Sequence, residues 1–236
     1  RLARCERMSI AESPLGRERE GLDACVHCGF CLPACPTYLA LEDENDSPRG
    51  RLLLMGALLD GTVERNDPVV REHLDKCLGC RACETACPSG VPYGRLLEAT
   101  RETLVETRPL PRMARFVLFV FSSPLLLWGS LFKARIARAT GLASLLARVL
   151  PRRLAMPFAM LASTRRSSVA EWQASGDGAR GTATLLTGCV MEGLFAGVNR
   201  ATDRVLTVNG WQMRPTEGQR CCGALHAHAG DAKTAR

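Results

Sequence analysis

The chain has 236 residues, with 31 basic and 24 acidic side chains, a formal net charge of +7 and 12 cysteines. Eight of these cysteines fall into two short runs, which argues against the disulfide framework of a small secreted protein. The basic residues form no nucleic-acid motif and are not interleaved with aromatic residues, so we expect no nucleic-acid partner.

The charge is unevenly distributed along the chain. Residues 1–100 carry 12 basic and 16 acidic side chains, whereas residues 101–170 carry 12 basic and 2 acidic ones, a local balance of +10. That middle segment would favour an anionic partner or a membrane surface, although a basic solvated face explains the same composition. The first residues are charged and contain no apolar stretch, which argues against a signal peptide and favours a reducing, cytoplasmic setting.

The two cysteine runs follow a predicted polar lead-in over residues 1–21. The first run covers residues 25–36 and the second covers residues 77–88, and both have the spacing C-x2-C-x2-C-x3-C-P. Bacterial-type ferredoxins hold iron–sulfur clusters with this spacing. Zinc sites usually use two C-x2-C pairs separated by a longer loop, so the pattern favours iron–sulfur clusters over zinc.

The runs predict two 4Fe–4S clusters with exchanged fourth ligands. The first three cysteines of such a run bind one cluster, whereas the cysteine before the proline points away and reaches the cluster of the other run. The expected ligands of the first cluster are Cys25, Cys28, Cys31 and Cys87. The expected ligands of the second cluster are Cys77, Cys80, Cys83 and Cys35.

The connection between the two runs is predicted to be helical. Ser47-Pro48 supplies an N-cap and a first-turn proline for one helix, and Asp67-Pro68 begins a second helix that leads into Cys77. A third helix is expected over residues 91–107. Because no strand pattern interrupts these helices, residues 22–108 are predicted to form an α-helical ferredoxin-type domain.

Three polar residues near the first run have two interpretations each. His27 is expected to tune the first cluster through hydrogen bonding rather than to ligate it, because the cysteine set is already complete. Arg49 and Arg51 would bind a carboxylate or cover a cluster, but surface salt bridges are the simpler expectation.

Residues 109–177 are predicted to form a basic and apolar helical connector. Residues 116–132 are uncharged, but this stretch is shorter than the roughly 20 residues that a membrane span needs, and Pro124 interrupts it. Leucine and valine then recur at helical spacing over residues 142–150, among arginines. We expect these helices to pack on the rest of the protein, and the alternative is a helix pair on a membrane surface.

Residues 178–236 are predicted to form a β-α-β-α unit with a parallel sheet. Ala183–Thr187 is expected to be a buried strand, and Trp211–Arg214 a second strand. Cys189 and the Cys221-Cys222 pair follow these strands, so we expect them to meet at the carboxyl edge of the sheet. They are candidates for a third redox site, by cluster ligation or by thiol chemistry.

The motifs resemble those of the iron–sulfur subunit of bacterial glycolate oxidase (glycolate dehydrogenase). The resembling segments of the N-terminal part are Cys28–Cys31, Cys35–Tyr38, Asp46–Arg51, His73–Cys77 and Cys83–Gly90. Those of the C-terminal part are Gly188–Val190, Asn199–Thr202 and Cys221–His226, which resemble the family's cysteine-rich CCG domain. The resemblance implies a mainly α chain with a small α/β part. The chain would then consist of the ferredoxin-type domain, the connector and a first CCG unit over residues 178–236. This unit is called incomplete because family members normally carry a second one.

The resemblance also implies an electron-transfer subunit of an oxidoreductase that is not catalytic alone. A separate FAD-containing dehydrogenase subunit would oxidise a 2-hydroxy acid, and this chain would pass the electrons through its two clusters toward a membrane acceptor. A further iron–sulfur centre is expected only in the complete CCG domain, because three cysteines are too few for a typical four-cysteine site.

Other functions remain open at this point. One alternative is a heterodisulfide-reductase-like, lactate-utilisation or anaerobic glycerol-3-phosphate dehydrogenase subunit, since these proteins share the CCG domain. Another is a non-enzymatic iron–sulfur sensor or scaffold. The expected location is the cytoplasm, with peripheral association at the cytoplasmic face of the inner membrane as an open alternative.

Overall fold

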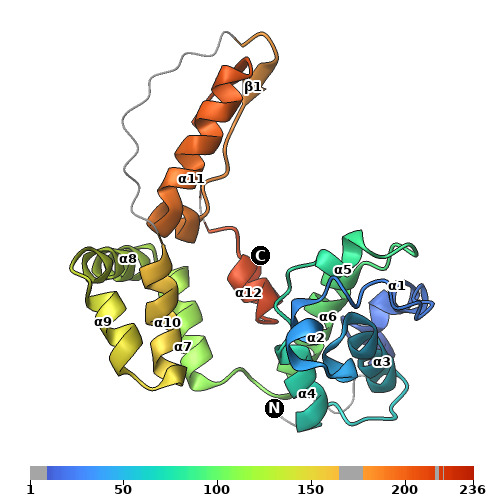
Figure 1. The fold of residues 1–236 in the computed structure, drawn as a ribbon. Helices are drawn as coiled ribbons and strands as arrows, with labels where there is room; N and C mark the ends of the chain where they lie inside the picture. The colour runs from blue at the N-terminus through green and yellow to red at the C-terminus, as the bar shows by residue number, and fades with distance from the viewer. Residues whose placement is uncertain (1–9, 165–177, 216–217, 220) are drawn as a thin grey trace. The chain divides into compact units, whose positions relative to one another are not determined.

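The computed structural model describes residues 10–164, 178–215, 218–219 and 221–236, and helices dominate it (Figure 1). The chain divides into two compact units. The first unit contains the described residues up to Arg115 together with Gly223–Arg236, and the second contains those of Phe116–Cys222. Within the described ranges, the sheet consists of two short strands, so the prediction of a mainly α chain with a small α/β part is confirmed.

Short helices and loops alternate in the first unit. Its elements are η2 (Ile10–Glu12), η3 (Gly16–Glu18), α1 (Arg19–Asp23), α2 (Pro36–Leu41), η4 (Glu44–Asp46), α3 (Pro48–Leu59), α4 (Pro68–Asp75), α5 (Ala82–Thr85), α6 (Tyr93–Thr107), α12 (Ala224–His228) and α13 (Ala232–Ala235). The first cysteine run lies between α1 and α2, and the second lies between α4 and α6. The connection between the runs is helical, as predicted.

Side-chain caps begin the two main helices between the runs. The Ser47 hydroxyl accepts a hydrogen bond from the amide of Gly50 at 3.0 Å, at the start of α3. The Asp67 carboxylate accepts hydrogen bonds from the amides of Val69 and Val70 at 2.8 and 3.1 Å, at the start of α4. Caps of this kind stabilise a helix by about 1 kcal/mol, and both were predicted from the sequence.

The core of the first unit includes residues from the predicted lead-in. Leu15 is fully buried, and its amide donates a hydrogen bond to the Thr103 hydroxyl in α6 at 3.1 Å. Leu22 is also buried in this core. Residues 10–21 therefore fold onto the ferredoxin-type domain, although their polar composition predicts a simple lead-in. The other main core residues are Leu52, Met55, Leu58, Val70, Leu74, Val91, Tyr93, Leu96, Leu97 and Leu104.

Four helices of the predicted connector form much of the second unit. They are α7 (Arg112–Ser122), which begins in the first unit, α8 (Pro124–Ala139), α9 (Leu142–Val149) and α10 (Arg152–Ser163). A break at Ser123 bends α8 by 99° from α7, because a residue before proline disfavours the helical conformation. Among the described helices, none is individually long and apolar enough to cross a bilayer. The bent α7–α8 pair meets that test by length and composition.

The small sheet has the predicted parallel β-α-β connection. Strands β1 (Gly181–Ala183) and β2 (Trp211–Met213) pair in parallel, and α11 (Cys189–Val208) connects them and lies beside them in Figure 1. The prediction of a buried strand over residues 183–187 is wrong in extent and burial. The strand ends at Ala183, and its first two residues are exposed. The apolar sequence favours a longer strand, but β2 offers only three residues for pairing.

Candidate iron–sulfur centres

Cysteines from both runs line one cavity of the first unit. Cys25, Cys28 and Cys31 come from the first run, and Cys87 comes from the second. The cavity encloses about 410 Å³ of space, including its open mouth. Cys83 also reaches its wall. The structure thus brings together the four cysteines that the sequence predicts for the first cluster.

A second cavity of the same unit gathers the other predicted set. Its wall contains Cys77, Cys80 and Cys83 from the second run and Cys35 from the first run, around about 300 Å³ of space. In both cavities the cysteine that precedes a proline therefore faces the other run. This grouping supports the crossed ligand assignment, which we develop as a proposal below.

The two runs share one unusual backbone geometry. His27 and Gly29 have positive φ angles of 52° and 84° on either side of Cys28. Gly79 and Arg81 have φ angles of 65° and 60° on either side of Cys80. Two left-handed residues at the same offsets wind each loop around its central cysteine, so that three sulfurs of a run converge. Only one of the two positions is glycine in each run, so residue type alone does not reveal the shared geometry.

The described cysteines carry free thiols, and burial makes Cys83 and Cys31 harder to ionise. None of the eleven cysteines in the described ranges forms a disulfide. Burial, together with the smaller effects of nearby Cys77 and Cys31, raises the pKa of Cys83 to about 12. Burial also raises the pKa of Cys31, where neighbouring Cys25 and Cys28 add to the effect and hydrogen bonds from backbone amides oppose it.

This arrangement of thiols fits an iron–sulfur cluster in each cavity. Several sulfurs packed around one space repel one another as thiolates, whereas bound iron removes their protons and neutralises the charge. Such a cluster would supply a one-electron carrier at each site.

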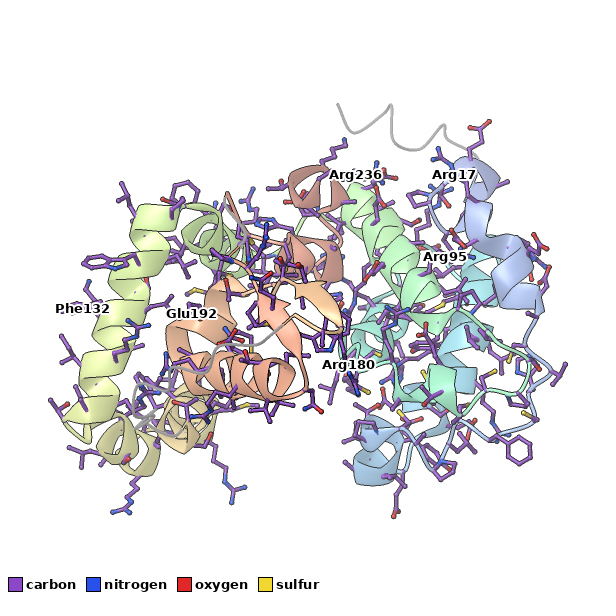
Figure 2. The ribbon with its side chains drawn as sticks, turned by 90° about the horizontal axis from the view of Figure 1, so that it is seen from above. Arg17, Arg95, Phe132, Arg180, Glu192 and Arg236 are labelled. Atoms are coloured by element: carbon purple, nitrogen blue, oxygen red, sulfur yellow. The ribbon has the colours of Figure 1, made fainter. Side chains whose placement is uncertain are left out.

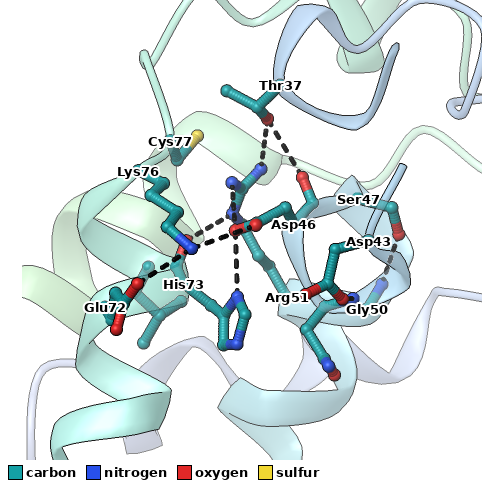
Figure 3. Close-up of polar contacts among 12 residues, drawn as sticks. Thr37, Asp43, Asp46, Ser47, Gly50, Arg51, Glu72, His73, Lys76 and Cys77 are labelled. Atoms are coloured by element: carbon teal, nitrogen blue, oxygen red, sulfur yellow. Dashed lines mark hydrogen bonds and ion pairs between the residues drawn. The ribbon is translucent and has the colours of Figure 1, made fainter. Parts of the chain in front are cut away.

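A buried ion-pair network lies against the second cavity (Figure 3). Arg51 is 0% exposed and Asp46 is 1% exposed. The Arg51 Nη2 donates to Asp46 Oδ1 at 3.2 Å, and the Arg51 Nε donates to the carbonyl of His73 at 2.7 Å. The Arg51 Nη1 donates to the Thr37 hydroxyl at 3.0 Å and lies 4.0 Å from the sulfur of Cys35. The expectation of a surface salt bridge for Arg51 is therefore wrong, because the fold encloses both partners.

Asp46 accepts contacts from two further side chains. His73 Nδ1 lies 3.0 Å from Asp46 Oδ1, and Lys76 Nζ lies 3.4 Å from Asp46 Oδ2. Burial alone would raise the pKa of Asp46, but the contacts with His73 and Lys76 outweigh it and hold the pKa below its usual value. Donor atoms of Asp43, Asp46 and His73 lie within 4.8 Å of one another. The neighbouring cations already neutralise Asp46, so we assign this group to the ion-pair network.

Other polar groups contact the cysteine sulfurs or the cysteine loop. The Tyr93 hydroxyl donates to the sulfur of Cys77 at 3.6 Å, and burial raises the Tyr93 pKa well above its usual value, which keeps this donor protonated. Arg101 in α6 donates to the carbonyl of Cys77 at 2.7 Å and to that of His228 in α12 at 3.0 Å. The sequence gives no local signal for either contact, because each spans distant parts of the chain.

The candidate third site lies in the second unit. Cys189 begins α11, and Cys221 is close enough to form a hydrogen bond with it. Burial raises the pKa of Cys189, and the neighbouring Cys221 and Cys222 raise it further. The structure therefore brings Cys189 together with the Cys221-Cys222 pair, the residues proposed from the sequence.

Comparisons with known proteins support both parts of this architecture. A family model described as a 4Fe-4S dicluster domain matches residues 21–91, which include both cysteine runs. A second model, described as a cysteine-rich domain (CCG), matches residues 183–236. No solved structure matches the chain.

Three relatives illustrate the similarity. The probable glycolate oxidase iron-sulfur subunit of Bacillus subtilis is 36% identical over 228 residues, which cover 90% of this chain and 51% of the relative. The glycolate oxidase iron-sulfur subunit of Escherichia coli is 37% identical over 215 residues, covering 88% of this chain and 48% of the relative. A dihydromethanophenazine:CoB–CoM heterodisulfide reductase component of Methanosarcina barkeri is 33% identical over 99 residues, covering 36% of this chain and 24% of the relative. The chain spans about half the length of the first two relatives.

The fold, the cysteine cavities and the two domain matches define a class of protein: an iron–sulfur protein that combines a 4Fe–4S dicluster domain with a cysteine-rich domain. Within this class, the chain is homologous to the iron–sulfur subunits of glycolate oxidase. The resemblance predicted from the sequence motifs is confirmed.

Proposed function

We propose that this chain carries electrons through two 4Fe–4S clusters within the iron–sulfur subunit of a glycolate or related 2-hydroxy-acid dehydrogenase. The observation that carries the proposal is that the eight cysteines line two cavities, each of which combines both runs, with Cys83 in the wall of both. In this assignment Cys25, Cys28, Cys31 and Cys87 hold one cluster. Cys77, Cys80, Cys83 and Cys35 hold the other. Identities of 36% and 37% to glycolate oxidase iron-sulfur subunits support the dehydrogenase assignment.

The number of electrons released by the substrate suggests where this chain acts in the reaction. A 2-hydroxy acid releases two electrons and two protons when it becomes a 2-oxo acid. We place a FAD on a partner subunit, because a flavin accepts the pair of electrons and passes them on singly. Each cluster takes one electron at a time, so two clusters suit delivery from a flavin to a distant acceptor.

We further propose that helices α7–α10 place the protein at the cytoplasmic face of a membrane, where the acceptor would lie. Leu125 and Trp128 of α8 are 83% and 67% exposed, and Phe132 points away from the same helix (Figure 2). Residues 101–170 carry a balance of +10. Apolar side chains beside basic ones suit an anionic lipid surface. Their exposure supports the membrane-surface alternative over packing against the rest of the chain.

A second candidate function is thiol chemistry at the cysteine-rich site. The proximity of Cys189 and Cys221, together with the similarity to a heterodisulfide reductase component, favours it. Turnover of a thiol–disulfide substrate without a flavoprotein would support this candidate. A protein that contains iron but shows no cluster reduction would instead favour a sensor or scaffold.

The test uses the protein co-expressed with a flavin-containing 2-hydroxy-acid dehydrogenase subunit. After anaerobic purification, adding glycolate or lactate should reduce the flavin and then bleach the visible absorption of the clusters. A matched sample with Cys28→Ala should reduce its flavin but show less bleaching, because one cluster is damaged. Flavin reduction without any bleaching in the intact complex would contradict the proposed electron transfer.

A further inference from the structure

Polar side chains lie close to two cysteine sulfurs of the second cavity. The Arg51 guanidinium lies 4.0 Å from the sulfur of Cys35, and the Thr37 hydroxyl lies 3.2 Å from the same sulfur. The Tyr93 hydroxyl lies 3.6 Å from the sulfur of Cys77. The Thr37 hydroxyl donates to the carbonyl of Asp46 at 3.0 Å, so the Arg51 charge and the Tyr93 hydroxyl are the groups that can donate to these predicted ligands of the second cluster.

The polar side chains near the first cavity are more exposed to solvent. The ring of exposed His27 lies 3.8 Å from the sulfur of Cys25. Arg49 reaches the wall of this cavity, but its side chain is partly exposed and is paired with Glu44. Both Arg49 and Arg51 are paired with a carboxylate, but water screens the partly exposed Arg49 more strongly than the buried Arg51, so Arg49 acts more weakly on its cavity.

The buried position of Arg51 makes its charge effective. Asp46, the His73 carbonyl and Thr37 fix the guanidinium, and no part of it is exposed to solvent. Charges interact more strongly in the protein interior than in water. A cluster becomes more negative when it gains an electron, so a nearby positive charge and hydrogen bonds to sulfur favour its reduced form.

We propose that Arg51, positioned by Asp46, raises the reduction potential of the second cluster above that of the first. The inference rests on the proposed function, because it requires both clusters. An electron on the first cluster would then move to the second, oxidising the first and reducing the second without any change in covalent bonds. The second cluster, bound by Cys35, Cys77, Cys80 and Cys83, would hold electrons before they leave the chain.

An anaerobic redox titration followed by electron paramagnetic resonance tests this inference in the full gene product. The Arg51→Gln variant should lower the potential of one cluster and leave that of the other unchanged. The Asp46→Asn variant should shift the same cluster in the opposite direction, because Arg51 then loses its counter-charge. A purely structural role for the pair would not give shifts of opposite sign.

Two further variants control for charge and location. Arg51→Lys keeps the positive charge, so it should restore most of the potential that Arg51→Gln loses. Arg81→Gln removes a charge from the wall of the same cavity, but the Arg81 side chain is 60% exposed, so the potential should stay near that of the unaltered protein. If Arg51→Gln cannot hold iron, the Arg51→Lys and Asp46→Asn variants decide the question.

Iron and sulfide analysis of every sample distinguishes a failure of the proposed function from a failure of the proposed role of Arg51. If the unaltered protein contains no cluster, the proposed function fails. If clusters are present, an unchanged potential in Arg51→Gln would overturn the inference about Arg51. Equal shifts of both clusters, or shifts of the same sign in Arg51→Gln and Asp46→Asn, would also overturn it.

Discussion

Cys87 and Cys25 line the same cavity, although they belong to different cysteine runs. Cys87→Ser should therefore perturb the cluster bound by the first run, while the cluster of Cys77, Cys80 and Cys83 stays intact. Cryogenic electron paramagnetic resonance of the reduced variant can distinguish the two signals. Cys35→Ser is the matched control, because it should perturb the other cluster. If Cys87→Ser altered only the cluster of its own run, the crossed assignment would be wrong.

Arg101 links α6 to the second cysteine run and to the C-terminal helix α12. Arg101→Ala removes hydrogen bonds to the carbonyls of Leu74, Cys77 and His228, and should lower the free energy of unfolding by about 1–3 kcal/mol. Urea unfolding under anaerobic conditions measures this change. Arg95→Ala on the same helix is the control. Its exposed ion pair should contribute less than about 1 kcal/mol, and equal effects would argue against the proposed role of Arg101.

Gly79 adopts a left-handed conformation that side chains disfavour. A Cβ at this position would meet no neighbouring atom within 4 Å, so Gly79→Ala tests conformation alone. The substitution should destabilise the folded state by about 1–2 kcal/mol. Gly129→Ala, inside α8 and equally free of close contacts, should instead stabilise that helix by roughly 0.5–1 kcal/mol. Thermal unfolding of both variants should therefore show shifts of opposite sign, and a common sign would contradict this account of the loop.

The chemistry of the site was largely predictable from sequence because it is local. Four thiols at fixed short offsets specify a cluster-binding loop, and Ser47 and Asp67 each cap a helix that begins within three residues. The parallel β-α-β connection also followed from the pattern, since hydrophobic periodicity changes from strand to helix along the chain. These features depend little on distant parts of the protein.

The features that could not be predicted from the sequence depend on tertiary contacts. Arg51 looked like a surface cation, but α3 turns it inward against Asp46 and the second cavity. Leu15 lies in a polar segment, and only its packing against α6 shows that it belongs to the core. The length of β1 depends on its partner β2, which no local pattern within residues 183–187 can specify.

The connector helices should hold the protein on membranes without crossing them. Residues 116–132 are uncharged but interrupted by Pro124, and no single described helix here is long and apolar enough for a span. Washing with high salt or alkaline buffer should therefore release membrane-bound protein. The Leu125→Glu variant should bind anionic vesicles less tightly than the unaltered protein. Persistence on membranes after both washes would show that the bent α7–α8 pair inserts into the bilayer.

Iron and acid-labile sulfide analysis of the anaerobically purified chain tests the central claim most directly. Two crossed sites require about eight irons and about eight sulfides per chain, because each 4Fe–4S cluster contains four of each. The visible absorption should also bleach when a strong reductant is added. Stoichiometric zinc without sulfide would contradict the assignment of both cavities as iron–sulfur centres.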